Sequence, residues 1–271
     1  MKLDAFAGDQ ILDKNRRNTL LVVGAIGLGY AGLRGLPGLF PETLELEPMA
    51  NPPGFRRYVA GETSGGFDPF VGLNMQEPAE AAAMRAAADL RVRENICATL
   101  YGGLDLTGSD VPMASFSDYY CPYCRVQTKR LADMVRSGDI GVSVAWHELP
   151  LLGESSNLAA KAALAAKRQG AYPEFHARLM RSPFRATLEY LETLARDTDV
   201  DGAQLVEDMN SPETSRELED SAALARLFAF IGTPALVIGR TVVQGQVSDQ
   251  MIRRIVELER EEGWSDICPA A

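Results

Sequence analysis

The sequence predicts an α/β domain that is preceded by an apolar segment and a linker. The predicted elements follow the order strand, helix, strand, helical block, two strands and helix. A Cys-x-x-Cys pair, Cys121 and Cys124, falls at the junction between the first strand and the first helix of this series. An uncharged apolar run, Thr19 to Leu33, lies near the N-terminus. These three observations define the fold class and point to the strand-to-helix junction as the place for chemistry.

Composition excludes several classes of protein. The chain has 271 residues, of which 46% are hydrophobic, so it can bury at least one ordinary core and is not disordered throughout. Its formal net charge of −10 argues against a nucleic-acid-binding surface, which needs clustered Lys and Arg to displace counterions from phosphates. Four cysteines are too few for a scaffold built from disulfides, so any pairing does chemistry or locks one local contact.

The N-terminal apolar run has the properties of a membrane anchor. With Arg34 reaching the headgroups, residues 19–40 provide about the 20 residues that cross a bilayer. Basic residues before the run favour a cytoplasmic location for residues 1–18. These basic residues are Lys14, Arg16 and Arg17. We therefore expect a single-pass protein of the bacterial inner membrane with its remaining residues in the periplasm; a cleaved signal sequence and a buried glycine-rich helix are the alternatives.

The next segment, residues 41–78, has the composition of a linker arm. It is rich in Pro, Gly, Glu and Asn, and such a segment buries little apolar surface. It also carries apolar side chains that an inert spacer does not require: Phe55, Tyr58, Phe67, Phe70 and Leu73. A loosely packed arm is therefore the expectation, and docking on the domain or on a neighbouring membrane protein is the alternative.

The remaining sequence divides into a leading helix, residues 79–104, and a domain, residues 105–271. Alanine and charged residues favour the helix, and Gly102-Gly103 end it. The predicted strands of the domain are 111–116, 140–149, 234–238 and 241–244, and its predicted helices are 125–137 and 249–261. Between the second and third strands, a helical insertion is expected at about 153–230.

A Cys-x-x-Cys pair at this junction has a physical use. The thiolate is the form that attacks disulfides, and the positive end of a helix dipole stabilises it. Cys121 is therefore the expected nucleophile, and Cys124, one turn further on, is the expected resolving thiol. Pro122 suits the first helical position, where its missing N–H costs nothing. Half of a zinc site is the alternative, but the sequence has no second pair of this kind, so no metal or cofactor is expected.

A second signature, Gly232-Thr233-Pro234, precedes an apolar strand far downstream. Thioredoxin-fold proteins carry a cis-proline loop facing the active-site disulfide at such a place, and a cis X-Pro bond is uncommon. The backbone of Thr233 would pair there with an extended substrate as an added strand, holding its disulfide against Cys121. A proline that begins an edge strand is the alternative.

Taken together, these motifs resemble the DsbA-like thiol–disulfide oxidoreductases. The resemblance rests on Phe116 to Arg125, on Glu148 to Gly153 with Ser156, Ala159 and Ala160, and on Gly232-Thr233-Pro234. It covers about residues 105–262 and implies a thioredoxin-like fold with an inserted helical domain. The redox pair implied is Cys121 and Cys124, and the implied substrate-binding residues are Pro122, Tyr123, Thr233 and Pro234.

The direction of electron flow stays open at this point. Pro122-Tyr123 differs from the Pro-His of the best-known oxidase and looks like the dipeptide of many glutaredoxins. Thr233 before the proline resembles isomerases and reductases as much as oxidases.

For four other residues near these motifs, the sequence is compatible with two different roles. Asp118 and Glu148 either relay protons and tune the thiolate or have surface and capping roles. His147 either faces the disulfide or is a packed strand-end residue. Trp146 either frames a substrate groove with Tyr123 or belongs to the core.

Exported proteins that contain thiols or disulfides are the expected partners, together with a redox partner protein whose identity the sequence does not reveal. Two further functions remain open. One is a dedicated thiol reductant for metal or haem assembly, and the other is an anchored accessory subunit of a membrane protein complex.

Cys97 and Cys268 are expected to form a second, structural disulfide. In an oxidising compartment, two leftover cysteines are more often paired than free. Two buried, inert thiols are the alternative.

Overall fold

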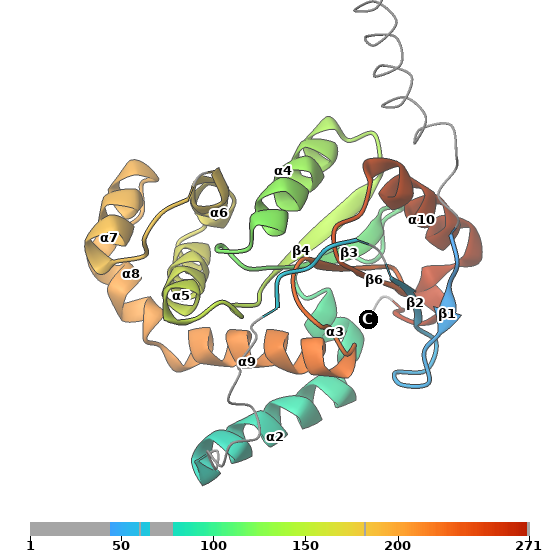
Figure 1. Cartoon of the computed structure of the whole chain (residues 1–271), viewed down its shortest axis with the longest axis horizontal. Coiled ribbons are helices and arrows are strands. Elements are labelled where there is room, and N and C mark those ends of the chain that lie inside the picture. The colour runs from blue at the N-terminus through green and yellow to red at the C-terminus, as the bar shows by residue number, and fades with distance from the viewer. Residues whose placement is uncertain (1–43, 60, 66–77, 182, 270–271) are drawn as a thin grey trace, which may run out of the picture. The chain divides into compact units, whose positions relative to one another are not determined.

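The computed structural model describes residues 44–59, 61–65, 78–181 and 183–269, and this part of the chain forms a mixed sheet (Figure 1). Its strands are β1 (Glu47–Pro48), β2 (Arg56–Val59), β3 (Val111–Ser117), β4 (Val142–Glu148), β5 (Ala235–Ile238) and β6 (Thr241–Gln244). Their order across the sheet is β1-β2-β6-β5-β3-β4. β3 pairs parallel with β4 and antiparallel with β5, and β6 pairs antiparallel with β5 and parallel with β2.

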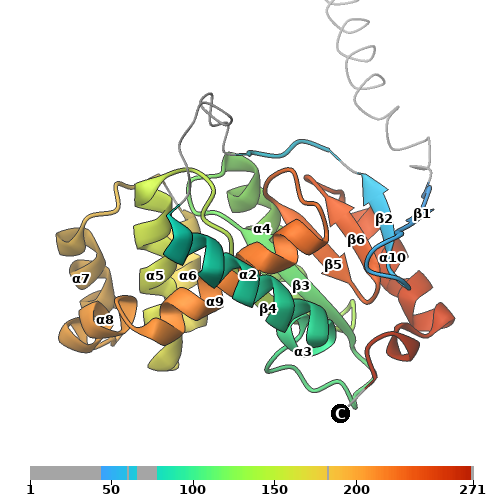
Figure 2. The same cartoon turned by 90° about the horizontal axis from the view of Figure 1, so that it is seen from below.

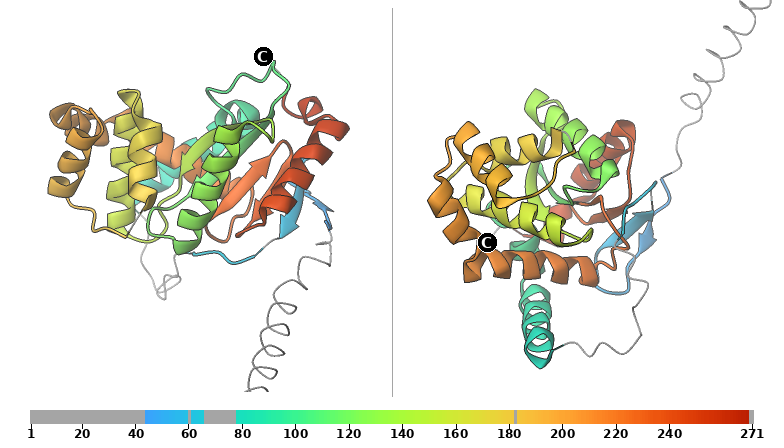
Figure 3. Two further views of the ribbon diagram at one scale, coloured as in Figure 1. Left: turned by 90° about the horizontal axis from the view of Figure 1, so that it is seen from above. Right: turned by 60° about the vertical axis from the view of Figure 1, so that its left-hand side comes forward.

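Helices cover both faces of this sheet. They are α2 (Ala79–Glu94), α3 (Ile96–Leu100), α4 (Pro122–Ser137), α5 (Glu154–Arg168), α6 (Tyr172–Arg181), α7 (Leu188–Asp197), α8 (Gly202–Met209), α9 (Pro212–Leu227) and α10 (Asp249–Glu262). Figure 2 shows α2, α3 and α9 in front of the sheet. The left view of Figure 3, taken from the opposite side, shows the green α4 and the red α10 in front of it. Helices α5 to α9 fall between β4 and β5 in the sequence, where the helical insertion was expected.

The strand and helix that meet at the Cys-x-x-Cys pair form for local reasons. Every residue of β3 is buried, as expected for a central strand whose two faces both carry helices. Leu131 and Met134 of α4 are buried, and Gly138 ends the helix in the left-handed conformation, with φ 71°. The loop between β3 and α4 is therefore held at both ends.

Within the segment 41–78, residues 55–59 dock on the domain, which is the alternative to a loosely packed arm. β2 pairs with β6, and Phe55 is only 3% exposed, with its ring centroid 5.1 Å from that of Phe228. The composition of the segment did not predict β2, because a strand of four residues is stabilised by its backbone hydrogen bonds to β6 and not by the types of its own residues. Phe67, Phe70 and Leu73 lie outside the described residues.

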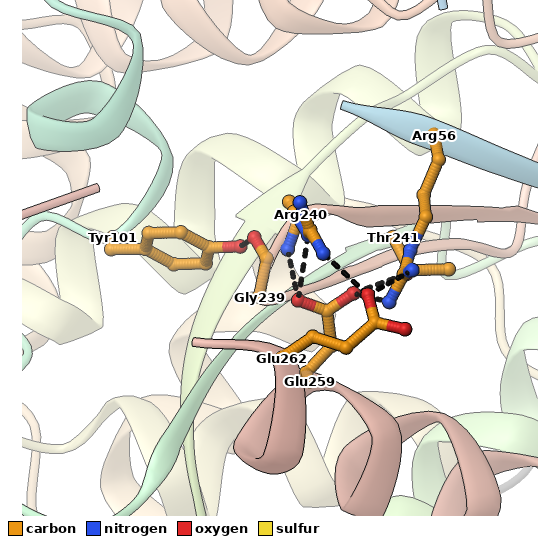
Figure 4. Close-up of polar contacts among 7 residues, drawn as sticks. All are labelled: Arg56, Tyr101, Gly239, Arg240, Thr241, Glu259 and Glu262. Carbon is orange, nitrogen blue, oxygen red and sulfur yellow. Dashed lines mark hydrogen bonds and ion pairs between the residues drawn. The ribbon is translucent and has the colours of Figure 1, made fainter. Parts of the chain in front are cut away.

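A buried carboxylate fastens this N-terminal strand to the last helix (Figure 4). Glu259 of α10 is 0% exposed and accepts hydrogen bonds from Arg56 Nη2 at 2.7 Å and from the backbone N–H of Arg240 at 3.0 Å. The Thr241 hydroxyl donates to the same carboxylate. Arg56 Nη1 also contacts Glu262 at 2.5 Å. β2, β6 and α10 are thus joined through one side chain.

Glu259→Ala is expected to lower the free energy of unfolding by about 3 kcal/mol, because it leaves the half-buried Arg56 and the backbone of Arg240 without their carboxylate. Urea denaturation of the full chain measures this. Glu257→Ala, the same change at an exposed position of α10, should alter stability by less than about 0.5 kcal/mol. Equal losses in the two variants would contradict the importance of the network.

The leading helix expected over 79–104 is divided. α2 ends at Glu94, and Asn95 adopts φ −141° and ψ 54° before α3 begins at Ile96. α2 packs along α9, where Arg91 Nη2 lies 2.6 Å from Asp220 Oδ1. The break turns the chain so that α3 also contacts α9.

Cys97 and Cys268 are joined in a disulfide with a Cα–Cα distance of 5.4 Å. Cys97 lies in α3, and Cys268 follows the short 3₁₀ helix Trp264–Asp266. The bond pins the C-terminal tail to the helices that precede β3.

No helix among the residues that the structure describes is long and apolar enough to cross a membrane. The predicted cytoplasmic residues 1–18 and the predicted anchor 19–40 lie outside the described residues.

Candidate active site

The two cysteines of the Cys-x-x-Cys pair lie where β3 leads into α4. Cys121 is the N-cap of α4, and its Sγ accepts a hydrogen bond from the backbone N–H of Cys124 at 3.2 Å. Pro122 is the first helical residue, where it has no N–H to leave unpaired. In its protonated form, the Cys121 thiol donates to the carbonyl oxygen of Thr233 at 3.3 Å. Both thiols are free and have no exposed surface.

These contacts give the two thiols different acidities. The pKa of Cys121 is lowered from 9.0 to about 6, mainly by the hydrogen bond with the Cys124 side chain and also by Ser64, although burial acts in the opposite direction. Burial raises the pKa of Cys124 well above 9.0, and the hydrogen bond with Cys121 adds to this. At neutral pH the site therefore holds a Cys121 thiolate beside a protonated Cys124, which is the division of roles that a nucleophile and a resolving thiol need.

The ultraviolet absorbance of the thiolate in the reduced protein is expected to rise with a midpoint near pH 6. The pKa of Cys121 is lower in the folded than in the unfolded chain, so the thiolate stabilises the reduced fold fully above about pH 9, and this contribution is lost as the pH falls through about 6. The Cys121→Ser variant, which lacks the acidic thiol, is the control. A single midpoint near pH 9 in the wild type would contradict the assignment.

The loop at Thr233-Pro234 faces this pair, and its peptide bond is cis. Thr233 was expected to present a free backbone to a substrate, but the structure does not leave it free. Its N–H donates to the carbonyl oxygen of Ser64 at 2.9 Å, and its carbonyl oxygen accepts from the N–H of Ser64 at 2.6 Å. The pairing position is occupied by the chain itself.

Asp118 braces the loop that carries Cys121. It is 1% exposed, so it has no surface role. Its Oδ2 accepts from the N–H groups of Leu151 at 2.7 Å and Leu152 at 3.0 Å, and Oδ1 accepts from the N–H of Tyr120 at 2.7 Å and from the Ser156 hydroxyl. Asp118 therefore joins the active loop to the loop before α5, a structural role in which it caps neither α4 nor α5.

Glu148 is the centre of a buried cluster beside the same loop. Its Oε1 accepts hydrogen bonds from the hydroxyls of Tyr119 at 2.6 Å and Tyr172 at 2.7 Å, and His176 Nδ1 lies 2.7 Å from the Tyr119 hydroxyl. Burial raises the pKa of both tyrosines well above 10.0, and the charge of Glu148 adds to it. Glu148 thus reaches the active loop through Tyr119, two residues before Cys121. No sequence motif identifies this cluster, because Tyr119, Tyr172 and His176 are each at least 24 positions from Glu148.

His147 is packed and does not face the thiols. Its Nε2 lies 2.9 Å from the carbonyl oxygen of Leu100, and its ring stacks on Phe116 with centroids 4.5 Å apart. Burial lowers the pKa of His147 to about 4, so the ring is neutral near pH 7. Of the two hypotheses for this residue, the packed one holds.

Trp146 and Tyr123 lie at different places around the site. Trp146 is partly buried and lines a groove of about 1130 Å³ between α4 and α6, together with Tyr172 and His176. The Tyr123 hydroxyl hydrogen-bonds to the carboxylate of Glu62, which raises the pKa of Tyr123. The sequence did not single out Glu62 or Ser64, because both fall in the segment taken for a linker.

A family model described as the DSBA-like thioredoxin domain matches residues 113–257, more than half of the chain. The chain belongs to the DSBA-like thioredoxin domain family. The matched residues run from β3 to α10 and include the Cys-x-x-Cys pair, the helical insertion and the cis-proline loop. Members of this DSBA-like family are thiol–disulfide oxidoreductases.

Solved structures agree with membership of the DSBA-like family. A thioredoxin-like oxidoreductase from Silicibacter pomeroyi DSS-3 is 35% identical, with a TM-score of 0.56 over 60% of this chain and 97% of that chain. A periplasmic thioredoxin-like protein from Salmonella enterica serovar Typhimurium is 25% identical, with a TM-score of 0.54 over 62% and 97%. ScsC from Proteus mirabilis is 25% identical, with a TM-score of 0.55 over 67% and 84%. Among curated proteins, no match was found.

Proposed function

We propose that this chain is a membrane-anchored, periplasmic thiol–disulfide oxidoreductase that acts on disulfides of exported proteins through Cys121 and Cys124. One observation carries the proposal. The Cys121 thiol has a pKa of about 6 and lies at the N-terminus of α4, 3.3 Å from the carbonyl oxygen of Thr233. Such a thiol is largely a thiolate at neutral pH, which is the attacking species in thiol–disulfide exchange.

The exchange proceeds in two balanced steps. The Cys121 thiolate attacks one sulfur of a client disulfide, a new sulfur–sulfur bond forms as the client's own bond breaks, and the other client sulfur leaves as a thiolate and takes up a proton. Cys124 then loses its proton and attacks Cys121 Sγ, which releases the reduced client and leaves the Cys121–Cys124 disulfide. The reverse sequence oxidises a client dithiol, and a redox partner protein sets the direction.

Two observations support the compartment and the anchor. The Cys97–Cys268 disulfide is typical of an oxidising environment such as the bacterial periplasm. The apolar segment at 19–40, with basic residues before it, favours an anchor that leaves the domain outside the cytoplasm.

Redox equilibration with glutathione tests the proposed activity. The Cys121–Cys124 couple is expected to titrate reversibly between about −120 mV, typical of a strong oxidant, and about −270 mV, typical of a reductant. Reduction of insulin in the presence of dithiothreitol then measures turnover. A pair that does not equilibrate with glutathione and does not turn over insulin would overturn the proposal.

A reporter that is active only in the periplasm is expected to be active when fused after Ala271 of the full chain. High salt should leave the protein in the membrane fraction, because an apolar anchor is not released by screening of charges. Deletion of residues 19–40 is the control and should leave the reporter inactive. Recovery of a soluble form that begins near residues 35 to 45 would instead show a cleaved signal sequence.

A further inference from the structure

The segment Gly61–Gly65, here called the strap, lies on the cis-proline loop as an added strand. Its Ser64 forms an antiparallel bridge with Thr233 through two reciprocal backbone hydrogen bonds of 2.6 and 2.9 Å. Upstream, the N–H of Gly61 donates to Gln246 at 2.9 Å, and the N–H of Gln246 donates to the carbonyl oxygen of Glu62 at 3.0 Å. In Figures 1 and 2 this light-blue segment runs from β2 toward α4.

Glycines permit this close approach of two backbones. A Cβ on Gly65 would lie 2.6 Å from the carbonyl oxygen of Ile231, and a Cβ on Gly232 would lie 2.7 Å from the carbonyl oxygen of Ser64. Real side chains do not reach such distances from backbone atoms. The sequence thus has no side chain at the two positions where one would push the strap off the loop.

Two side chains of the strap contact the Cys-x-x-Cys turn. Ser64 lies close enough to Cys121 to lower the pKa of that thiol, and Glu62 lies close enough to Tyr123 to raise the pKa of its hydroxyl. With the strap in place, Cys121 and Thr233 have no exposed surface. A client disulfide needs contact with Cys121 Sγ, and an extended client needs the N–H and C=O of Thr233. Both positions are filled.

We propose that the strap is an internal substrate mimic that a client must displace before it reacts, with Ser64 in the place of the client's reacting cysteine. This inference rests on the proposed function and names the regulation of that site. Serine has the shape of cysteine with oxygen in place of sulfur, so its hydroxyl marks the position of the client sulfur without being able to form the covalent bond. A client strand forms the same backbone hydrogen bonds to Thr233 as the strap does. Client binding is therefore an exchange of one strand for another at the cis-proline loop.

The first test opens the strap without altering the cysteines. Gly65→Ala adds a methyl group that meets the carbonyl oxygen of Ile231, and Gly108→Ala, where a Cβ meets nothing within 4 Å, is the matched control. Alkylation of Cys121 by iodoacetamide is measured on the full chain at about pH 9, where the thiolate is fully formed and the rate reports access alone. Gly65→Ala is expected to react at least about fivefold faster than wild type, since a larger fraction of molecules is open.

The outcomes of this test are separable. Equal alkylation rates for wild type, Gly65→Ala and Gly108→Ala, with unchanged melting temperatures, would overturn the strap proposal. Faster alkylation of Gly65→Ala, together with faster exchange with glutathione disulfide, supports it. Faster alkylation in a chain that exchanges with no disulfide supports the strap and refutes the proposed function instead.

The second test fixes the strap in place. In Ser64→Cys combined with Cys124→Ser, the introduced thiol and Cys121 should together give two electrons and two protons to glutathione disulfide, forming one intramolecular bond and two glutathione molecules. Thr63→Cys in the same background is the control, because neighbouring residues of an extended segment point to opposite sides. Peptide mapping should find the link only in the first variant, which then fails to capture clients until it is reduced. Absence of the link, or capture of clients while it is present, would sink the proposal.

Discussion

Cys121→Ser is expected to lower thiol exchange by at least about 1,000-fold, because the variant has no sulfur to form the mixed disulfide. Cys124→Ser is expected to increase the amount of client that is trapped as a mixed disulfide. It keeps the Cys121 thiol, with a serine hydroxyl in the place of the Cys124 thiol as its hydrogen-bond partner. It lacks the group that resolves the mixed disulfide, so complexes with clients accumulate. Non-reducing gels of membranes from cells that express each full-length variant measure both effects.

The difference between the two variants rests on the geometry of the α4 N-terminus. The Cys124 backbone N–H still donates to Cys121 Sγ after the exchange to serine, since this hydrogen bond of 3.2 Å involves no side-chain atom of Cys124. Cys97→Ala together with Cys268→Ala, which removes both cysteines outside the site and leaves no unpaired thiol, is the control and should capture nothing. Trapped complexes with Cys121→Ser and none with Cys124→Ser would reverse the assigned roles.

Removal of the second disulfide, by Cys97→Ala together with Cys268→Ala, is expected to lower the free energy of unfolding by about 5 kcal/mol in the chain-entropy description. The bond links residues 171 positions apart, so it restricts most of the unfolded chain. Urea denaturation of both proteins with the Cys121–Cys124 pair fully reduced measures the difference.

Thiol exchange should be retained in the same double variant below its unfolding transition, because neither Cys97 nor Cys268 contacts the Cys-x-x-Cys turn in the described structure. This separates a stabilising bond from a second redox pair. Coincident denaturation curves for wild type and variant would show that the bond contributes nothing to stability, and loss of exchange in folded protein would show a redox role.

Local sequence alone determined the part of the site that is continuous along the chain. The pattern of an apolar strand followed by an amphipathic helix lies within about 25 consecutive residues. β3, α4 and the position of Cys121 at their junction were therefore predictable. The same holds for the helical insertion and for the hairpin of β5 and β6. The pairing of Cys97 with Cys268 followed from the count of cysteines, because two remained after the local pair.

Contacts between distant segments were decided only by the tertiary structure. The sequence offered Asp118 and Glu148 as candidates but not their partners, because a buried carboxylate takes whichever donors the fold brings to it, here Tyr119 and Tyr172 for Glu148. His147 and Glu148 are neighbours whose side chains leave opposite faces of β4, so one packs under α3 and the other faces the active loop.

The strap is the clearest case of this division. Its composition of Gly, Glu, Thr and Ser is that of a linker, and the sequence by itself identified only Gly232-Thr233-Pro234 as a loop for an added strand. Which strand would be added depends on backbone hydrogen bonds, and these carry no signature in residue type. Thr233 pairs through its backbone with Ser64, 169 residues away, because β2 pairs with β6 and the residues after β2 therefore lie beside the cis-proline loop.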